Sequence, residues 1–103
     1  MSEQLTGRTL VADLGPLQTR LTYDSAQRMT FIVTRGAGLA PNGHTETVDI
    51  EIAELRPELF LVSWREASGA TVTHVEDLAT SALHSVVTID GRLTRLTGTI
   101  KEA

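Results

Sequence analysis

The stretch from Phe60 to Ala79, FLVSWREASGATVTHVEDLA, decides the fold of this 103-residue chain. It reads as two strands on either side of a turn at Ser68-Gly69, and it contains the single tryptophan, Trp64. Side chains alternate between the two faces of a strand, so the length of the turn decides which residues of the two strands share a face. The register of this hairpin therefore predicts which side chains lie inside the molecule.

The rest of the chain continues the same pattern. β-Branched residues are frequent, and short apolar runs alternate with turn residues such as Asp90-Gly91, which is typical of a sandwich or barrel. We expect eight strands, near residues 8–12, 18–23, 27–34, 45–54, 58–66, 71–78, 83–89 and 93–100. The sequence thus predicts a single all-β domain over residues 1–103, a small eight-stranded antiparallel up-and-down barrel.

Two segments leave an alternative open. Residues 74–87 place apolar side chains at helical spacing, so a short helix is the alternative to the strand pair that we expect, with its turn at Thr80-Ser81. Residues 35–43, RGAGLAPNG, contain three glycines and a proline. They predict a long connection that is either a plain surface loop or a lid over the mouth of the barrel.

Composition excludes several classes of protein. The formal net charge is −4, the single lysine is Lys101 and the arginines are scattered, so we expect no nucleic-acid partner. The absence of cysteine excludes disulfides and cysteine-ligated metals. No phosphate-binding glycine loop is present, and we expect no cofactor. The N-terminus, MSEQLTGRTL, lacks a signal-peptide pattern, and no apolar run approaches the roughly 20 residues of a membrane span. We therefore expect a cytoplasmic protein without a membrane partner.

A two-residue turn at Ser68-Gly69 is the register that we favour, with the bulky side chains Phe60, Val62 and Trp64 pointing inward. Carried through the turns that follow, this register predicts an interior polar half that consists of Glu66, Thr71, Thr73, Asp77, His84, Thr88, Arg95 and Thr97. The earlier strands supply the apolar half, which consists of Leu21, Tyr23, Met29, Phe31, Val33, Val48, Ile50 and Ile52. The alternative is a three-residue turn at Ala67-Ser68-Gly69, which brings His74 and Glu76 to the face of Trp64 instead.

The mixed interior predicts a ligand pocket, because unpaired charges are costly in a purely structural core and pockets combine apolar walls with a few polar groups. Candidate catalytic residues are Glu66, as a general base beside Trp64, and Asp77 with His84, as a carboxylate that orients an imidazole. A solvated rim glutamate and a structural Asp–His pair are the alternatives. Candidate ligand-binding residues are Tyr23, Phe31, Phe60, Val62, Trp64, Thr73 and Arg95.

Arg95 is either a clamp for an anionic ligand or a brace paired with Glu66. A metal site made by His44, His74 and His84 is not expected, because the favoured register puts His74 and His84 on opposite faces.

Three segments carry a resemblance to a known family: SWRE at residues 63–66 followed by Gly69, TVTHVED at residues 71–77, and RLTG at residues 95–98. With these motifs the chain resembles the MoaF-like domain, named after molybdenum cofactor biosynthesis protein F, a calycin-like or lipocalin-type barrel. The resemblance covers essentially the whole chain, and it implies a cup whose open end receives a small, partly hydrophobic molecule. The positions that match are Trp64, Glu66, Thr71, Thr73, Asp77 and Arg95. Phenolic acid decarboxylases are similar barrels that use a tyrosine pair, whereas this chain has the single tyrosine Tyr23.

The favoured register also predicts an apolar outer surface, which suggests a homodimer. Its members are Leu59, Leu61, Val72, Leu78, Leu83, Val87, Ile89 and Leu96. The sequence thus favours a barrel that binds a small hydrophobic or amphipathic molecule. The alternatives are a cofactor-free lyase, isomerase or cyclase, with Glu66 as base and Arg95 as anion clamp, and a pure interaction module.

Overall fold

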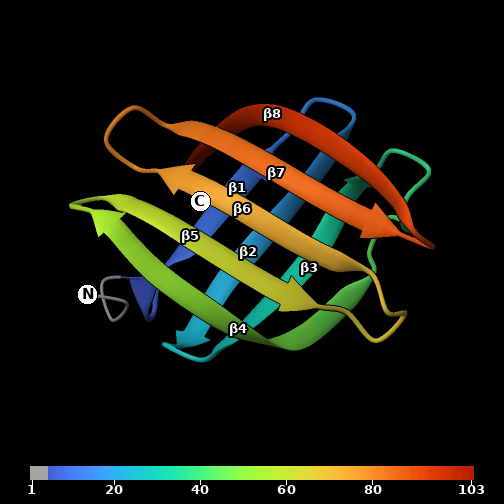
Figure 1. The fold of residues 1–103 in the computed structure, drawn as a ribbon, viewed down its shortest axis with the longest axis horizontal. Coiled ribbons are helices and arrows are strands. Elements are labelled where there is room, and N and C mark those ends of the chain that lie inside the picture. The colour runs from blue at the N-terminus through green and yellow to red at the C-terminus, as the bar shows by residue number, and fades with distance from the viewer. Residues whose placement is uncertain (1–4) are drawn as a thin grey trace.

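The computed structural model describes residues 5–103, which form eight β-strands and a closed antiparallel barrel (Figure 1). The strands are β1 (Thr9–Asp13), β2 (Leu17–Ser25), β3 (Arg28–Gly36), β4 (Thr45–Arg56), β5 (Leu59–Arg65), β6 (Thr71–Asp77), β7 (Ala82–Ile89) and β8 (Arg92–Glu102). Each strand pairs with the next one in sequence, and β1 pairs with β8 to close the barrel. The predicted all-β, eight-stranded up-and-down barrel is confirmed.

The segment 74–87 forms strands β6 and β7, so the alternative of a short helix is wrong. The two strands are joined by residues 78–81, and Ser81 adopts a positive φ of 67° that reverses the chain. The apolar residues of this segment have helical spacing because some of them belong to the strands and others to the turn between the strands, and members of both groups pack on the core. Leu83 and Val87 are buried inside, and Leu78 packs against the core from the turn.

Strand β4 changes partner along its length. Its first part, from Thr45 to Asp49, pairs with β3, and its second part, from Ile50 onward, pairs with β5. The predicted alternation in this strand is confirmed, because Val48 and Ile50 are buried while the five residues between and beyond them are exposed, namely Thr45, Thr47, Asp49, Glu51 and Ala53. In the first part of β4, the side chain of Glu46 reaches the β5–β6 turn, where the backbone N–H of Ala67 donates to Glu46 Oε2.

The turn between β5 and β6 contains one residue more than the favoured register assumed. Trp64 is opposite Val72 and Val62 is opposite His74. The backbone N–H of Glu66 donates to Ala70 O and the N–H of Gly69 donates to Glu66 O, which closes a three-residue turn over residues 67–69. Gly69 has φ of +93°, a conformation that other residues rarely adopt. The favoured two-residue turn is therefore wrong, and the three-residue alternative is confirmed.

This single residue inverts the faces of all three strands that follow. The pairings predicted around Asp90-Gly91 are confirmed, including Val86 with Arg95 and His84 with Thr97. Those residues nevertheless point to the opposite face of the sheet from the predicted one. The pairing of each strand fixes which residues of the next strand face inward, so the change in β6 is passed on to β7 and β8. Five of the residues predicted to face outward from these strands therefore lie inside or pack against the core: Val72, Leu83, Val87, Ile89 and Leu96. A sixth, Leu78 in the β6–β7 turn, also packs against it.

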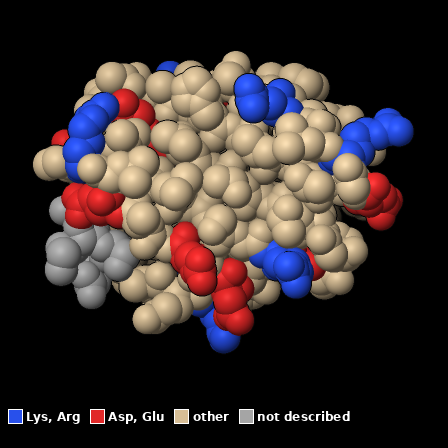
Figure 2. Space-filling model, viewed as in Figure 1, with Lys and Arg blue, Asp and Glu red and all other residues tan. Residues whose placement is uncertain are grey.

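The outer surface of the barrel is consequently less apolar than the predicted patch. Of the eight predicted members, Leu59 and Leu61 point outward, and both are half-buried. Figure 2 shows that charged side chains lie around the margin of the face made by β5, β6 and β7, and that its centre is uncharged. The predicted homodimer loses most of the residues on which it was based and stays a prediction.

The barrel is closed at the end near the N-terminus. Leu5 is fully buried, and the N–H of Gly7 donates to Tyr23 O, which holds the segment before β1 against the end of β2. Phe60 and Met29 are buried in the same core as Tyr23 and are fully inaccessible to solvent. Among residues 5–103, no helix is long and apolar enough to cross a membrane.

Replacement of Gly69 tests the conformational requirement of the β5–β6 turn. A Cβ at this position meets no atom within 4 Å, so the cost of Gly69→Ala is that of the positive φ alone. We expect Gly69→Ala to lower the free energy of unfolding by about 1 kcal/mol in urea denaturation, and Gly69→Asn to lower it less, because Asn tolerates positive φ better. Ala67→Gly is the control for the same turn. Equal stability of the Ala and Asn variants would contradict this account of the turn.

Candidate binding cavity

A cavity of about 60 Å³ lies at the end of the barrel where the β5–β6 turn meets the loop after β3. Most of its wall is apolar and comes from four parts of the chain: the β1–β2 turn, strands β2 and β3, the loop, and strands β5 to β7. The apolar lining residues are Leu14, Leu17, Leu21, Phe31, Val33, Leu39, Ala40, Trp64, Val72, Val87 and Ile89. Thr19, Glu66, His74 and Ser85 add four polar side chains to this lining.

Trp64 and Glu66 form the rim of the cavity at the end of β5. The indole Nε1–H of Trp64 donates to Glu66 Oε2 over 3.2 Å, and the ring packs 6.3 Å from that of Phe31. Burial raises the pKa of the Glu66 carboxyl above its usual value of 4.5, the hydrogen bond from Trp64 partly opposes the increase, and the nearby charge of Glu46 adds to it. Glu66 is therefore a half-buried carboxyl that holds its proton to higher pH than a solvated glutamate.

Three buried side chains deeper in the barrel form one hydrogen-bonded network. Tyr23 Oη donates to Glu76, at 3.0 Å from Oε1 and 2.8 Å from Oε2. His74 Nδ1 lies 3.0 Å from Glu76 Oε2. Tyr23 and Glu76 are 0% exposed and His74 is 3% exposed. Burial and the adjacent Glu76 carboxylate raise the pKa of Tyr23 well above its usual value, so the phenol stays protonated and acts as the donor.

Ser85 lies opposite His74 on strand β7 and also points into the cavity. Its side chain is 0% exposed, and among the described residues Ser85 Oγ is the buried side-chain polar atom that lacks a hydrogen-bond partner. Buried hydroxyl groups are nearly always paired, and an unpaired one costs about 1–3 kcal/mol. Ser85 therefore presents an unpaired hydroxyl to the cavity, where a water molecule or a ligand atom can pair with it.

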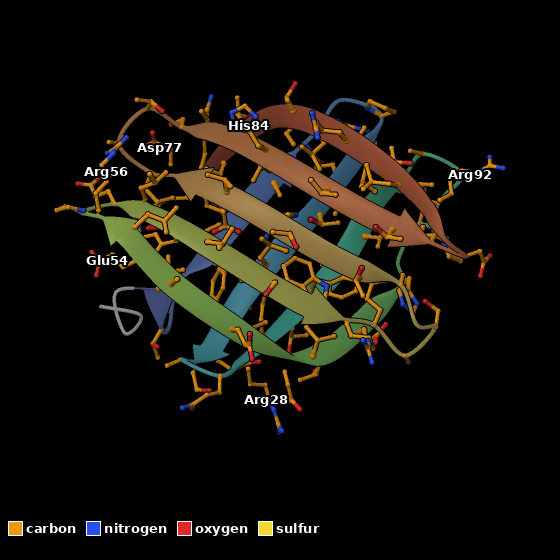
Figure 3. All side chains as sticks on the ribbon, in the orientation of Figure 1. Arg28, Glu54, Arg56, Asp77, His84 and Arg92 are labelled. Atoms are coloured by element: carbon orange, nitrogen blue, oxygen red, sulfur yellow. The ribbon has the colours of Figure 1, made fainter. Side chains whose placement is uncertain are left out.

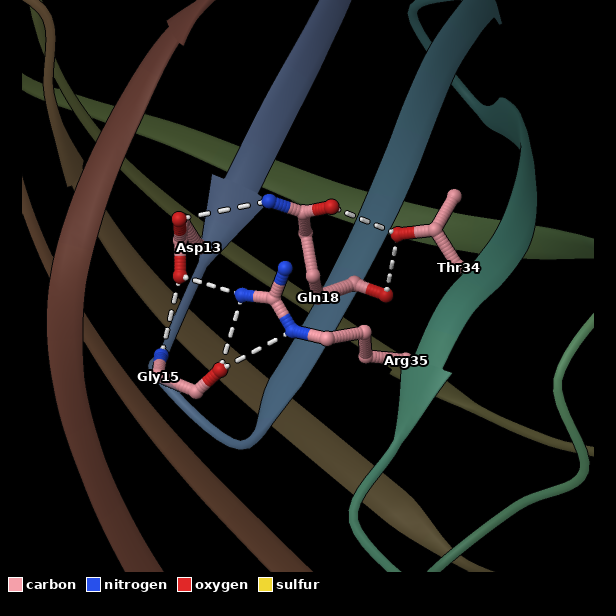
Figure 4. A network of polar contacts seen from close by, with 5 residues as sticks. All are labelled: Asp13, Gly15, Gln18, Thr34 and Arg35. Carbon is pink, nitrogen blue, oxygen red and sulfur yellow. Dashed lines mark hydrogen bonds and ion pairs between the residues drawn. The ribbon is translucent and has the colours of Figure 1, made fainter.

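One side of the cavity mouth is fixed by a polar network between the β1–β2 turn and strand β3 (Figure 4). Arg35 donates to Gly15 O at 2.8 Å and to Asp13 Oδ1 at 3.2 Å, and Asp13 also accepts from the N–H of Gly15. The hydrogen bond from Gly15 holds the pKa of Asp13 below its usual value. Gln18 continues the network to Thr34 Oγ1. These contacts position Leu14 and Leu17 over the cavity.

The loop after β3 forms another part of the mouth. Leu39 and Ala40 of this loop line the cavity, and both donate their N–H groups to Gly36 O. A Cβ at Gly36 would collide with the carbonyl oxygen of Ala40, so the loop approaches the strand closely because residue 36 is glycine. Leu39 and Ala40 thus line the same cavity as Glu66, and the lid over the mouth stays a prediction.

Six of the predicted site residues lie inside the barrel. Phe31, Trp64 and Glu66 line the cavity. Tyr23, Phe60 and Val62 are fully buried in the core below it. Inward orientation of these six is confirmed by the structure, while a role in catalysis or binding stays a prediction for each of them.

The other four predicted site residues lie outside, because of the extra residue in the β5–β6 turn. Thr73 and Asp77 are on the outward face of β6, and His84 and Arg95 are exposed on β7 and β8. Asp77 pairs with Arg56 at 3.2 Å and accepts from the N–H groups of the following turn, and not from His84. Figure 3 shows Asp77 beside Arg56 at the end of the barrel opposite Arg92. The predicted Asp77–His84 pair is wrong for a second reason, because the turn over residues 78–81 is longer than the expected turn at Thr80-Ser81 and places His84 opposite Val75 and Asp77 opposite Ala82. The predicted Arg95 clamp or brace inside the barrel is wrong because Arg95 is exposed on β8.

The residues that the favoured register missed are His74, Glu76 and Ser85. A signal for them exists in strand β7, where one face carries Leu83, Val87 and Ile89 and the other carries His84 and Thr88. That alternation favours the observed face and would have corrected the parity of β6. His74 lies inside and His84 outside, and no group of three histidine, aspartate or glutamate residues suited to a metal ion occurs within residues 5–103.

Replacement of Ser85 by alanine tests the unpaired hydroxyl. We expect Ser85→Ala to raise the free energy of unfolding of the ligand-free protein by about 1 kcal/mol, because it removes a buried polar atom without a partner and leaves a side chain of nearly the same volume. Thermal or urea denaturation measures the change. Thr19→Val is the matched control, since Thr19 also lines the cavity but is half-buried. A loss of stability of about 1 kcal/mol in Ser85→Ala would contradict the assignment.

Comparisons with known proteins agree with the fold. The family model described as MoaF-like matches residues 6–101. A solved structure of a protein from Burkholderia vietnamiensis, described as a putative beta-lactamase, superimposes with a TM-score of 0.88 at 24% sequence identity, covering 96% of this chain and 95% of that one. No curated protein sequence matches. At this identity the solved structure supports the fold alone.

Proposed function

The chain belongs to the MoaF-like family, and we propose that it binds a small, mainly apolar molecule without net charge in the cavity beside Trp64. The observation that carries the proposal is the composition of the cavity wall, which is apolar except for a few convergent polar groups, one of them the unpartnered Ser85 Oγ. Ligand sites have this composition. A barrel filled only for stability would place an alanine or valine where Ser85 stands.

Charge in the cavity favours a neutral ligand. No lysine or arginine belongs to the part of the wall formed by the described residues, whereas Glu66 contributes a carboxyl. An anionic ligand would therefore meet no countercharge and would lose its hydration, which costs several kcal/mol. Loss of Arg95 to the outer surface removes the anion clamp that the sequence suggested.

Size limits the ligand further. At about 15 Å³ for each water molecule, a cavity of this volume holds roughly four waters or a ligand of similar size. Drug-sized ligands occupy sites of roughly 300–1,000 Å³. A larger ligand requires displacement of Leu39 and Ala40, which are on the loop and are held to the strand by hydrogen bonds to Gly36.

The description of the Burkholderia protein does not extend to this chain. Serine beta-lactamases combine a serine with a lysine three residues later and further lysine-containing motifs. The single lysine here is Lys101, which is exposed on β8 and pairs with Val11 of β1. Ser85 has no lysine near it, so that chemistry is not proposed.

Binding in the cavity is tested with a library of neutral compounds that contain up to about six non-hydrogen atoms. We expect binders to change the fluorescence of Trp64 and the amide spectra of residues 37–40, both of which report on the cavity. Val87→Phe fills the cavity and should abolish binding, whereas Val86→Phe, on the outward face of the same strand, should not. Binding that survives in Val87→Phe, or a library without a single binder, would refute the proposal.

A second candidate is proton transfer by Glu66, since burial raises its pKa toward the range useful to a general base. Because the indole N–H of Trp64 donates to Glu66, the fluorescence of Trp64 should change as the Glu66 carboxyl ionises. We expect a transition with a midpoint above 4.5 in the wild type, absent from Glu66→Gln. The charge of Glu46 raises the pKa of Glu66, so Glu46→Gln should keep the transition and shift it to lower pH. A wild-type midpoint at or below 4.5 would exclude this candidate.

A further inference from the structure

We propose that His74 and Ser85 form the polar end of the cavity and bind one uncharged oxygen atom of the ligand, a hydroxyl that contacts both side chains or a carbonyl that accepts from Ser85, with Glu76 and Tyr23 as positioning residues. This inference rests on the proposed function, because it specifies the ligand of the same cavity. It depends on three features: the pairing of two strands, the orientation of an imidazole ring, and two polar atoms without partners.

The strand register places His74 and Ser85 directly opposite each other on β6 and β7. Both side chains point inward and both line the cavity. Residues directly opposite in an antiparallel pair have Cβ atoms about 4.5–5.5 Å apart, so one ligand atom can reach both polar groups. The two residues therefore form one polar patch in an otherwise apolar part of the wall.

The orientation of the His74 ring is fixed from two sides. Nδ1 bonds to Glu76 at 3.0 Å, and the ring meets that of Trp64 edge-on, with centroids 4.9 Å apart and planes inclined by 72°. Glu76 itself is held by the hydroxyl of Tyr23, which contacts both carboxylate oxygens. A carboxylate that engages Nδ1 leaves Nε2 as the nitrogen that faces a ligand, as in other histidines positioned by acidic groups.

Neither polar atom of the patch has a partner in the described part of the chain. Ser85 Oγ is buried and unpaired. The hydrogen bond of His74 to protein is made through Nδ1, and none is made through Nε2 to residues 5–103. The unpaired Ser85 Oγ has a desolvation penalty, and Nε2 of His74 leaves a second hydrogen-bonding position beside it, so one polar ligand atom can engage both.

An uncharged oxygen is the ligand atom that suits this patch. Ser85 Oγ–H donates to either a hydroxyl or a carbonyl oxygen, and a hydroxyl in addition donates to an unprotonated Nε2. A carboxylate is disfavoured by Glu66 in the same wall and by the lack of a lysine or arginine there among the described residues. An ammonium group is disfavoured at this patch because the oxygens of Glu76 are already engaged by Tyr23 and His74, and the carboxyl of Glu66 lies at the rim, where it accepts from Trp64.

The experiment compares four probes of similar size with xenon, which enters apolar cavities without hydrogen bonds. The probes are butan-2-ol, butan-2-one, propanoate and isopropylammonium. Affinities are measured from amide and imidazole ¹⁵N spectra of the wild type, Ser85→Ala and Tyr23→Phe. We expect the alcohol and the ketone to bind more tightly than the two ions, and the alcohol, which donates to Nε2, to shift the Nε2 resonance of His74, which xenon leaves in place.

Ser85→Ala should weaken the alcohol and the ketone about three- to tenfold, the equivalent of one hydrogen bond, without weakening xenon. Tyr23→Phe keeps the Glu76–His74 contact but frees the carboxylate from its second donor. We expect it to broaden the His74 ring resonances and to weaken the alcohol, again without weakening xenon. A purely structural role for Tyr23 would change stability and leave the ring resonances and the selectivity unchanged.

The outcomes separate this inference from the proposed function. Xenon binding together with alcohol affinity that is unaffected by Ser85→Ala would overturn the inference and leave the cavity as a ligand site. Tightest binding of propanoate or isopropylammonium would overturn the choice of an uncharged oxygen. Failure of xenon and of all four probes to bind would refute the proposed function and the inference with it.

Discussion

The number of residues in the β5–β6 turn is the constraint on which the interior of this barrel depends. Three residues between Glu66 and Ala70, closed by Gly69 at positive φ, set the parity of β6, and the tight turns that follow transmit this parity to β7 and β8. A closed barrel has no free edge at which a change of register could stop. The inward faces of β6, β7 and β8 are therefore fixed together. A turn one residue shorter would bury Asp77 and Arg95 and expose Val72 and Leu83.

With this parity the barrel encloses a carboxylate, which needs compensation. Glu76 is fully buried, and an isolated charge at such a site would cost several kcal/mol. The phenol of Tyr23 and the imidazole of His74 occupy its oxygens, so the charge is shared within a small hydrogen-bonded unit. The unit spans from β2 to β6 across the interior, and it also gives His74 a single orientation. Interior packing and, in the proposed site, the orientation of His74 toward a ligand thus depend on the same three side chains.

Much of the fold follows from local sequence. The eight strands, the inward faces of β2 to β5 and the β7–β8 pairing depend on alternation and on the Asp90-Gly91 turn, which are readable over a few residues. The β5–β6 register is different, because Ser68-Gly69 suits a two-residue and a three-residue turn equally well. Strand β6 does not settle the choice, since it has polar residues on both faces: Thr71 and Thr73 on one, His74 and Glu76 on the other.

The candidate site shows the same division. The sequence predicts the inward orientation of Phe31, Trp64 and Glu66, which precede the ambiguous turn. It does not predict that of His74, Glu76 and Ser85, which follow the turn. The signal for those three residues is the apolar face of β7. That signal lies in a neighbouring strand and not in the β5–β6 hairpin. Parity in a small barrel is a property of the whole sheet, so it has to be judged from all strands at once.

The cavity is difficult to explain by stability alone. Three features lower or limit the stability of the empty barrel. They are the buried Ser85 without a partner, the half-buried Glu66 with its raised pKa, and Gly36, at which the loop approaches the strand closely. These features occur together at one end of the barrel, and the opposite end is closed by fully buried apolar side chains such as Leu5 and Phe60. The concentration of destabilising features at one end of an otherwise well-packed barrel therefore supports the proposed ligand site.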